Sequence, residues 1–592
     1  MTLLIAQAFN SAQAGEPSFT SVGPVADPNC DFSSIQEAIL ATSENIHVVD
    51  GIYVENINIT DSSETLVGGF SDCNAAESGV REAGSKSAIV PDTGVALIAT
   101  ANGGGLEDVT MTGFTISQGQ AAGFAPAGGL VITGSMNLTM FDSYLVENTG
   151  VLGGAAYVGP DASFFMRDTL VQNNTAVTGG GIYCAGCVLT IDRGSGVSDN
   201  QAVGNGMDTD DALGGGVFMN NGAQVLIFSG SKTPEQDALG IHNNTAAKNG
   251  GGIYLEESEL FIYGDDFFGF GDTVNPVNIS SNEAVESGGG IYASFDAVIT
   301  ATAIDLRDNV AGVSGGGIDL FFATGLTIHG EDLFSAGSCW NESPQKCNRM
   351  INNGILNGSA GSGTGGAIDM AGGVLNIFNT WFEGNHAGGD GSGLGAVLLV
   401  ENTDVNIENS VMHKNGFVTG EDRNILHFSA NGEGINMRFN TLVDNNNVTD
   451  AIIHLLGDGF NIRNSIVHQT NDAPVLTIQG SIPEFGFNCM LVHEDASLTG
   501  LGGGSIFATT VGDPVFYNRE AGDFNLYSES LLALDQCSAG PVPPPDFDLN
   551  LNTRGLDFNQ VGNDFFGFYD IGAIEYQGSD LNLDIIFADG FD

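Results

Sequence analysis

Residues Leu170 to Tyr183 read LVQNNTAVTGGGIY, and this stretch decides the fold. It contains an apolar residue, two variable residues, Asn, a small residue, and then glycines that precede a β-branched or aromatic pair. The same order recurs along much of the chain. Its Asn residues are Asn148, Asn174, Asn200, Asn244, Asn282, Asn309 and Asn385. Its glycine clusters begin at Gly153, Gly179, Gly214, Gly250, Gly288, Gly315 and Gly365.

This recurrence predicts a stacked solenoid. Glycine clusters lie about 25 residues apart at first and farther apart later, as expected where segments are inserted into a repeat. In a parallel β-helix like residues stack about 4.8 Å apart. Asn can then form an amide ladder, and glycine permits a sharp turn. Alternating segments such as Leu138–Met140 and Leu189–Ile191 would place apolar side chains in a narrow core. We therefore expect an all-β, single-stranded parallel β-helix.

Composition agrees with this fold. The chain has 592 residues, of which 86 are Gly and only 15% are charged, so a helical globular protein is disfavoured. A mean hydropathy of +0.08 without an uninterrupted apolar run of membrane-spanning length predicts a packed protein with no transmembrane segment in the mature chain. We expect a monomer.

The net charge of −57 is the most extreme feature of the composition. It excludes nucleic acid as a partner, because phosphate binding needs clustered Lys and Arg. The carboxylates are expected to form a solvated exterior that limits edge-to-edge aggregation. Calcium binding is the alternative, but Asp208–Asp211 and Asp546–Asp548 do not continue into a calcium-loop pattern. We predict no cofactor and no metal site.

The N-terminus predicts export. An apolar start at Leu3–Ala6 leads to Ala12-Gln13-Ala14, which has the form of a signal-peptidase site, although a basic segment is missing. An ordinary N-terminal strand is the alternative. Further on, Ile35, Ala38 and Ile39 share one face of a short helix that Ser33 or Ser34 can cap, and this helix would cover the open end of the core.

The entrance resembles that of bacterial pectin-lyase-like β-helix proteins. The resemblance rests on the Ser-Ile-Gln start of this helix at 34–36, on Gly51–Ile57 and on the Gly68-Gly69-Phe70 turn. It covers about 40 residues and implies a right-handed parallel β-helix with an N-terminal helical cap. It implies no particular activity.

The glycine repeats resemble a second family. Gly365–Ile368 and Phe382–Asn385 match the GGAI and FxxN tetrapeptides of the chlamydial polymorphic outer membrane protein family. In that family such repeats build a surface-exposed passenger that acts in adhesion. The sequence departs from the family because no transmembrane barrel is expected after the repeats. We therefore expect a secreted or loosely attached protein at a bacterial cell surface, associated with the outer membrane or cell envelope.

Eight cysteines fit an exported protein. We predict disulfides between Cys30 and Cys73, which flank the entrance, and between Cys339 and Cys347, which bracket an insertion. Cys184 and Cys187 form a C-x-x-C motif. A redox or zinc site would need a helix or a second ligand pair, so a local disulfide or two packed thiols is the preferred interpretation. Cys489 and Cys537 could pair late in the chain.

The order of these patterns predicts the organisation of the chain. The segments are a signal peptide at 1–14, the cap and first coils at 15–110, β-helix repeats at 111–510 with insertions near 205–213 and 331–363, a C-terminal capping segment at 511–576, and a tail at 577–592. Segments such as Gly512–Phe516 and Asp570–Glu575 resemble the closing segment of many bacterial β-helix proteins. The tail is either a sorting tag or an unstructured end.

Two functions remain open. The first is adhesion or interaction with a cell-surface or matrix glycan or protein. The second is a polysaccharide lyase or glycoside hydrolase on the same scaffold. Asp265-Asp266 and His329-Gly330 faintly resemble polygalacturonase elements, but their partners are absent where expected, and basic residues such as Arg167 and Arg307 occur singly. We predict no catalytic residue. Three carboxylates converging in one cleft would favour the enzyme.

Overall fold

The structure is a computed structural model that describes most of residues 19–526, and beyond them only Ala533, Leu549, Asp570 and 572–574. Within 19–526 it leaves out 25–28, 42–44, 83, 122–124, 207–209, 230–238, 265–275, 330–347, 357–362, 389–392, 417–421, 431–433, 447, 449, 470–473, 480–486, 489, 493–505 and 509–515. The predictions for the signal peptide, the tail, Cys339, Cys347, Cys489 and Cys537 lie outside the described residues.

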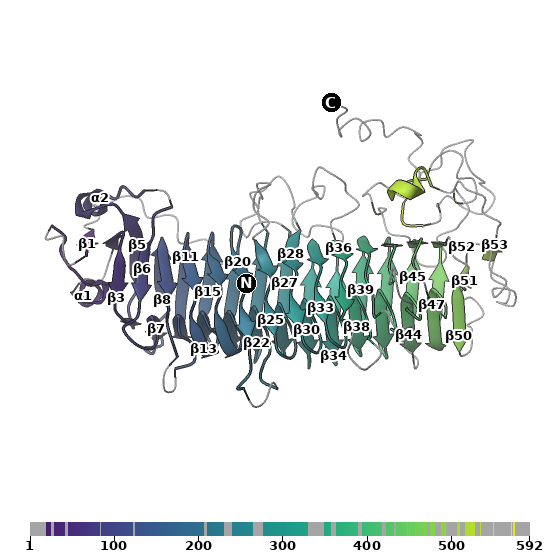
Figure 1. Cartoon of the computed structure of the whole chain (residues 1–592), viewed down its shortest axis with the longest axis horizontal. Coiled ribbons are helices and arrows are strands. Elements are labelled where there is room, and N and C mark those ends of the chain that lie inside the picture. Colours follow the sequence, from purple (N-terminus) through teal and green to yellow (C-terminus); the bar gives the residue numbers. More distant parts are fainter. Residues whose placement is uncertain are drawn as a thin grey trace, which may run out of the picture.

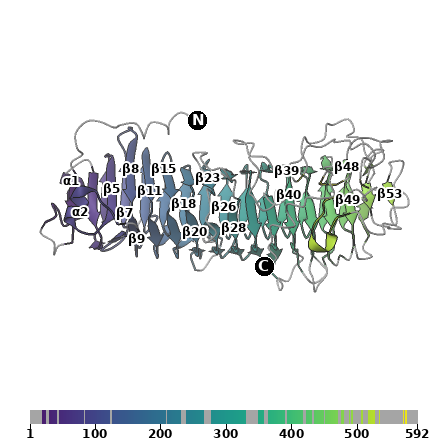
Figure 2. The same cartoon turned by 90° about the horizontal axis from the view of Figure 1, so that it is seen from above.

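The described strands pair in parallel and stack along one long axis (Figures 1 and 2). Sheet A comprises β1 Thr20–Val22, β2 Asn45–Val49, β5 Glu64–Phe70, β8 Glu107–Thr112, β11 Met136–Phe141, β15 Ser163–Arg167, β19 Val188–Ile191, β23 Gln224–Phe228, β27 Glu259–Tyr263, β31 Val298–Ala301, β35 Gly325–Ile328, β39 Val374–Phe378, β42 Asp404–Glu408, β45 Ile435–Arg438, β48 Phe460–Arg463 and β51 Phe487–Asn488. Sheet B comprises β3 Ile52–Val54, β6 Ser87–Val90, β9 Phe114–Ser117, β12 Tyr144–Val146, β16 Leu170–Gln172, β20 Gly196–Ser198, β24 Gly240–His242, β28 Val277–Ser280, β32 Ile304–Arg307, β36 Asn348–Ile351, β40 Thr380–Glu383, β43 Val411–His413, β46 Thr441–Val443, β49 Ile466–His468, β52 Met490–Val492 and β53 Ile506–Ala508.

Two further sheets complete the coil. Sheet C comprises β4 Ile57–Thr60, β7 Leu97–Ala101, β10 Leu130–Gly134, β14 Ala156–Val158, β18 Ile182–Ala185, β22 Val217–Asn220, β26 Ile253–Glu256, β30 Ile291–Ser294, β34 Ile318–Phe321, β38 Ile368–Ala371, β41 Leu398–Glu401, β44 Leu426–Ala430, β47 Ile453–Gly457 and β50 Leu476–Gln479. The short sheet D comprises β13 Thr149–Leu152, β17 Thr175–Thr178, β21 Gln201–Ala202, β25 Thr245–Ala246, β29 Glu283–Ala284, β33 Val310–Ala311 and β37 Gly354–Ile355.

One coil runs through β14 in sheet C, β15 in sheet A, β16 in sheet B and β17 in sheet D before the next coil begins. Alternating residues point inward and stack in register, as Leu138, Phe164 and Leu189 do across three neighbouring strands of sheet A. These inward residues form a continuous buried core. The parallel β-helix predicted from the repeat is therefore confirmed. Its right hand stays a prediction.

The glycine clusters line up from coil to coil, as the repeat predicts. The backbone N–H of Gly251 donates to the carbonyl of Gly288, and that of Gly289 donates to Gly315. A Cβ at Gly251 would lie 2.5 Å from the backbone of Glu283 in the next coil. Glycine is required there because neighbouring coils approach each other through their backbones.

A helix covers the N-terminal end of the core, as predicted. In α1 (Ile35–Ala41), Ile35, Ala38 and Ile39 are buried. Ser34 caps the helix, because its hydroxyl accepts a hydrogen bond from the N–H of Glu37 at 3.2 Å. Glu55 also accepts from the N–H of Ile35 at 2.9 Å.

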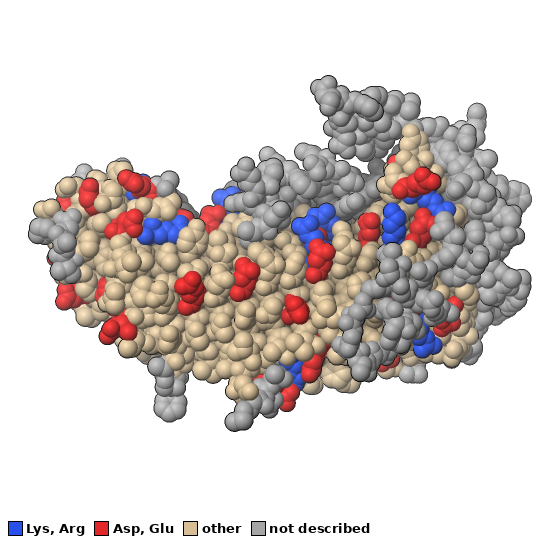
Figure 3. Space-filling model, in the orientation of Figure 1, with Lys and Arg blue, Asp and Glu red and all other residues tan. Residues whose placement is uncertain are grey.

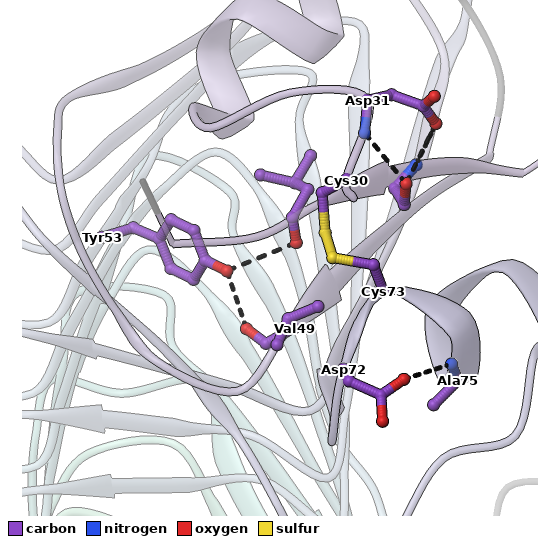
Figure 4. The surroundings of a disulfide bond; sticks show 9 residues. Cys30, Asp31, Val49, Tyr53, Asp72, Cys73 and Ala75 are labelled. Carbon is purple, nitrogen blue, oxygen red and sulfur yellow. Dashed lines mark hydrogen bonds between the residues drawn. A yellow bond between two sulfur atoms is a disulfide. The ribbon is translucent and has the colours of Figure 1, made fainter. Parts of the chain in front are cut away.

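The second helix, α2 (Cys73–Ser78), is attached to this entrance by a disulfide between Cys30 and Cys73, so this predicted pair is confirmed (Figure 4). Asp72 caps α2 by accepting from the N–H of Ala75 at 2.9 Å. The Tyr53 hydroxyl donates to the carbonyl of Val49 at 2.8 Å beside the disulfide. The covalent link and the caps therefore hold the first coil together.

The predicted insertion at 331–363 is too long. Residues Asn348–Ile351 and Gly354–Ile355 form β36 and β37, which pair with β32 and β33 of the preceding coil. Similarly, Leu213 at the end of the predicted 205–213 insertion accepts a hydrogen bond from the N–H of Gly179 and belongs to the stack. The coil resumes earlier than the glycine spacing indicates.

The described residues of the C-terminal segment pack on the flank of the solenoid. Phe516 and Phe524 contact each other with ring centroids 5.2 Å apart, and Phe524 stacks on Trp381 of sheet B at 5.7 Å. Arg519 forms an ion pair with Asp444. Among the described residues, no helix has both the length and the apolar composition needed to cross a membrane.

Candidate functional site

A ladder of Asn side chains runs along the bend that follows sheet B. Asn174 shows the repeated geometry: its Nδ2 donates to Oδ1 of Asn200 at 2.9 Å and to the carbonyl of Leu145 at 2.9 Å. The N–H of Asn174 donates to the same Oδ1 of Asn200 at 3.0 Å. All seven predicted Asn residues take part and all are buried. The ladder is structural, since each amide is occupied by neighbouring coils.

Four members of the ladder were missed by sequence reasoning. They are Asn353, Asn415, Asn445 and Gln469, which continue the same bonds to the last described coils. Met350-Ile-Asn-Asn353 carries the repeated spacing, but its glycines follow late, so the sequence pattern places it in the insertion. Gln469 could not be recognised as a ladder residue from the sequence, because Gln stands there in place of the repeated Asn.

A column of rings lies on the outer face of sheet C, which places one residue of each coil in register. Tyr157, Tyr183, Phe218, Tyr254 and Tyr292 stack with centroid separations between 4.6 and 5.7 Å. Phe218 is only 4% exposed. The rings cover one another, so their faces are not available as a stacking platform for a sugar, and the column stabilises the sheet.

Two carboxyl groups continue this column. Asp319 and Asp369 are paired residues on β34 and β38. Asp319 is 7% exposed and accepts a hydrogen bond from the hydroxyl of Ser314. Burial raises the pKa of Asp319 to about 6. Burial also raises the pKa of Asp369 well above its usual range, and neighbouring Asp319 raises it further. The pair therefore resists full ionisation near neutral pH.

Two histidines lie farther along the same column. His427 and His454 stack with ring centroids 4.8 Å apart. Nδ1 of His454 lies 2.7 Å from Oδ2 of Asp450, and the Thr477 hydroxyl donates to the other oxygen of Asp450 at 3.2 Å. Burial, with a smaller contribution from neighbouring His454, lowers the pKa of His427 to about 4. These side chains therefore stack on one another or pair their polar atoms within the sheet.

A polysaccharide-cleaving centre needs accessible carboxyls or a free base. Asp319 lies beneath the turn that starts at Gly315, where an added Cβ would be 2.6 Å from the Asp319 Cβ. The buried carboxylates of Asp192 and Asp305 bind Arg167 and Arg307 respectively. In the part of the chain that the structure describes, no group of His, Cys, Asp or Glu residues is arranged to hold a metal ion. The carboxyl groups of Asp319, Asp192 and Asp305 are therefore buried or engaged by neighbouring side chains.

The C-x-x-C motif forms a local disulfide. Cys184 and Cys187 are bonded to each other and are 0% and 1% exposed, within the core. A redox centre needs access to its partner thiol. The geometry therefore supports the structural interpretation of this pair.

The outer face of sheet A carries a different column. Its second half is polar: Thr300, Thr327, Asn376, Asn406, Asn436 and Asn461 stack one per coil. All six are partly exposed. Only some of these groups bond to each other, as Nδ2 of Asn461 does to Oδ1 of Asn436 at 3.0 Å. The face thus presents hydroxyls and amides at the spacing of the strands, about 4.8 Å.

Comparison with known proteins adds no assignment. No family model, curated protein or solved structure gives a match to the chain. The candidate site is therefore defined by its geometry alone, as the polar column of sheet A.

Proposed function

We propose that this chain is an exported interaction protein, secreted or held at a bacterial cell surface, whose solenoid binds a cell-surface or matrix glycan. The observation that carries the proposal is the polar column from Thr300 to Asn461, because a regular row of hydroxyl and amide groups suits a polymer that offers hydroxyls at regular intervals. The partner class also follows from the resemblance of the glycine repeats to adhesive passengers.

Two further observations support this proposal. Disulfides form in oxidising compartments, and the described residues hold the pairs Cys30–Cys73 and Cys184–Cys187. On the face of the molecule that Figure 3 shows, the described surface of the solenoid is largely uncharged, with scattered carboxylates and a few Lys and Arg residues, which suits an uncharged partner.

The test is binding of the purified full chain to immobilised plant, algal and bacterial polysaccharides. We expect retention on at least one neutral polymer and a reduction of about thirtyfold in the double variant Asn406→Ala, Asn436→Ala, since each of the two lost hydrogen bonds contributes about 1 kcal/mol. The matched control is Thr175→Ala, Gln201→Ala on sheet D, which should bind normally.

The same incubations test the alternative, a polysaccharide-degrading enzyme. Release of reducing ends or unsaturated products by the wild-type chain would favour the enzyme over the interaction protein. Equal binding by the sheet A and sheet D variants would contradict the assignment of the site to sheet A.

A further inference from the structure

A cleft lies between α1 and the first strands of the solenoid, at the purple end of Figure 1, away from the polar column of sheet A. Its volume is about 690 Å³, within the range of about 300–1,000 Å³ that small-molecule sites occupy. One wall is α1, with Ile39 and Leu40, and the other is β4 and the turn that follows it, with Asn58, Thr60 and Ser62.

The cleft exists because α1 is held against the free edge of β4. The Gln36 side chain pairs with the backbone of Asn58: Oε1 accepts from the N–H at 2.5 Å and Nε2 donates to the carbonyl at 3.2 Å. This carboxamide imitates the peptide group of a missing neighbouring strand and satisfies the edge at Asn58. The side chain of Asn58 is left exposed beside the cleft.

Glu64 lines the cleft and is only 2% exposed. It starts β5 opposite the core residue Val109, in the register of inward-pointing side chains. Its Oε2 is buried and has no hydrogen-bond partner within the described part of the chain. Burial raises the pKa of Glu64, while a hydrogen bond with the Ser62 side chain lowers it. A buried oxygen without a partner costs about 1–3 kcal/mol, which a donor from a ligand would recover.

We propose that this cleft binds a neutral saccharide unit, whose hydroxyls bond to Glu64 and to the amide and hydroxyl groups of Asn58 and Thr60 while a ring face contacts Leu40. Leu40 is 79% exposed beside these polar groups, which gives the mixed apolar and polar lining that a sugar needs. The choice of a saccharide rests on the proposed glycan-binding function, but the site is separate from sheet A.

Other ligand classes fit the lining less well. Among the described residues that line the cleft there is no Lys or Arg, so a phosphate or uronate would meet a carboxyl group without a compensating cation from them. A compact ammonium ion would use Glu64 alone and leave the surrounding uncharged polar groups without a partner. A polyhydroxylated ligand satisfies both kinds of group at once.

Saturation-transfer NMR on the full chain tests the site, with glucose, galactose, mannose, N-acetylglucosamine and cellobiose as neutral probes and with glucuronate and ethanolamine as charged ones. We expect at least one neutral probe to bind, and Glu64→Leu to weaken that binding at least tenfold. Asn58→Ala, which keeps the backbone pair with Gln36, should weaken it severalfold. Glu37→Gln on the exposed face of α1 is the matched control and should bind like the wild type.

Thermal unfolding of each variant shows whether the fold is retained. Silence of all neutral probes, ethanolamine binding in their place, or equal sugar binding by Glu64→Leu and wild type would overturn the proposal. Polymer retention measured on the wild-type chain separates the two claims: if the polymer is retained while no neutral probe gives an NMR signal with the wild type, the cleft fails and the sheet A function stands.

Discussion

The buried Asn ladder and the outer column of sheet C both contribute one residue per coil, yet they differ in how freely the residue varies. From Asn148 to Asn445 the ladder keeps one residue type. Over the same coils the outer column changes from Tyr and Phe to Asp, then Leu, then His. Two columns that span the same coils therefore differ in how many residue types they accept.

Hydrogen bonding explains the difference. From Asn174 to Asn445, each ladder Oδ1 accepts from both the N–H and the Nδ2 of the preceding Asn, and each Nδ2 reaches a carbonyl as well. Asp lacks the donor and Ala lacks both groups. A residue in the outer column has only to pack against its neighbours above and below, so rings, acids and imidazoles all fit. The outer column of sheet C therefore tolerates more residue types than the ladder does.

The largest expected effect breaks the ladder in its middle. Asn282→Ala removes the acceptor of the Asn244 N–H and Nδ2, both at 3.0 Å, and the donor to Asn309 and to the carbonyl of Ile241. We expect a loss of about 4 kcal/mol, at roughly 1 kcal/mol for each buried bond. Urea denaturation followed by circular dichroism measures this loss.

The control for this prediction is Asn406→Ala in the exposed column of sheet A, which should change stability by less than about 0.5 kcal/mol. A similar loss in both variants would show that the distinction between buried ladder and outward column is wrong.

The second effect concerns pH and the acid pair of sheet C. The pKa of Asp319 rises from 3.8 to about 6 on folding. Because the pKa is higher in the folded state, the folded protein binds this proton more tightly than the unfolded chain does. The free energy of unfolding is therefore highest below about pH 4 and falls as the pH rises through about 6. Asp319→Asn should be nearly as stable as wild type at pH 4 and more stable by up to roughly 3 kcal/mol at pH 7.5, at about 1.36 kcal/mol per pH unit. Denaturation curves at both values measure the difference, and equal stability at pH 7.5 would contradict it.

The sequence allowed the coil and its ladder to be predicted because both depend on local backbone needs. Gly289 and Asn282 occupy places where one residue type fits, so their spacing identifies the turn. The length of the insertion before β36 could not be predicted. The glycine cluster at Gly365 follows Asn353 at a longer distance than in most of the other repeats, so Asn353 was not recognisable as a ladder residue.

The candidate sites were not predictable in the same way. The polar column of sheet A appears only when residues from successive coils, such as Asn406 and Asn436, are placed in register. The cleft depends on Gln36 meeting the edge of β4, and nothing in the sequence near Glu64 marks that carboxyl as buried. Pairing across coils, and not any linear motif, creates both sites.

A smaller effect concerns the disulfide next to the ring column. Cys184 and Cys187 are separated by 3 residues, whereas Cys30 and Cys73 are separated by 43. Chain entropy gives about 2 kcal/mol for the short loop and about 4 kcal/mol for the long one. We expect Cys184→Ala, Cys187→Ala to lower stability by about 2 kcal/mol in urea denaturation. A loss of about 4 kcal/mol, as large as that expected for the long loop, would contradict the dependence on loop length.

The smallest effect tests whether the outer column depends on specific polar contacts. The Tyr254 hydroxyl lies 3.5 Å from the Ser294 hydroxyl, at the limit of a hydrogen bond, while its ring stacks between Phe218 and Tyr292. Tyr254→Phe keeps the ring and should cost about 0.5 kcal/mol or less, whereas Tyr254→Ala should cost about 3 kcal/mol because the stack is interrupted. Thermal unfolding distinguishes the two variants. If Tyr254→Phe were as damaging as Tyr254→Ala, the outer column would depend on hydrogen bonds as the Asn ladder does, and packing alone would not account for its variety.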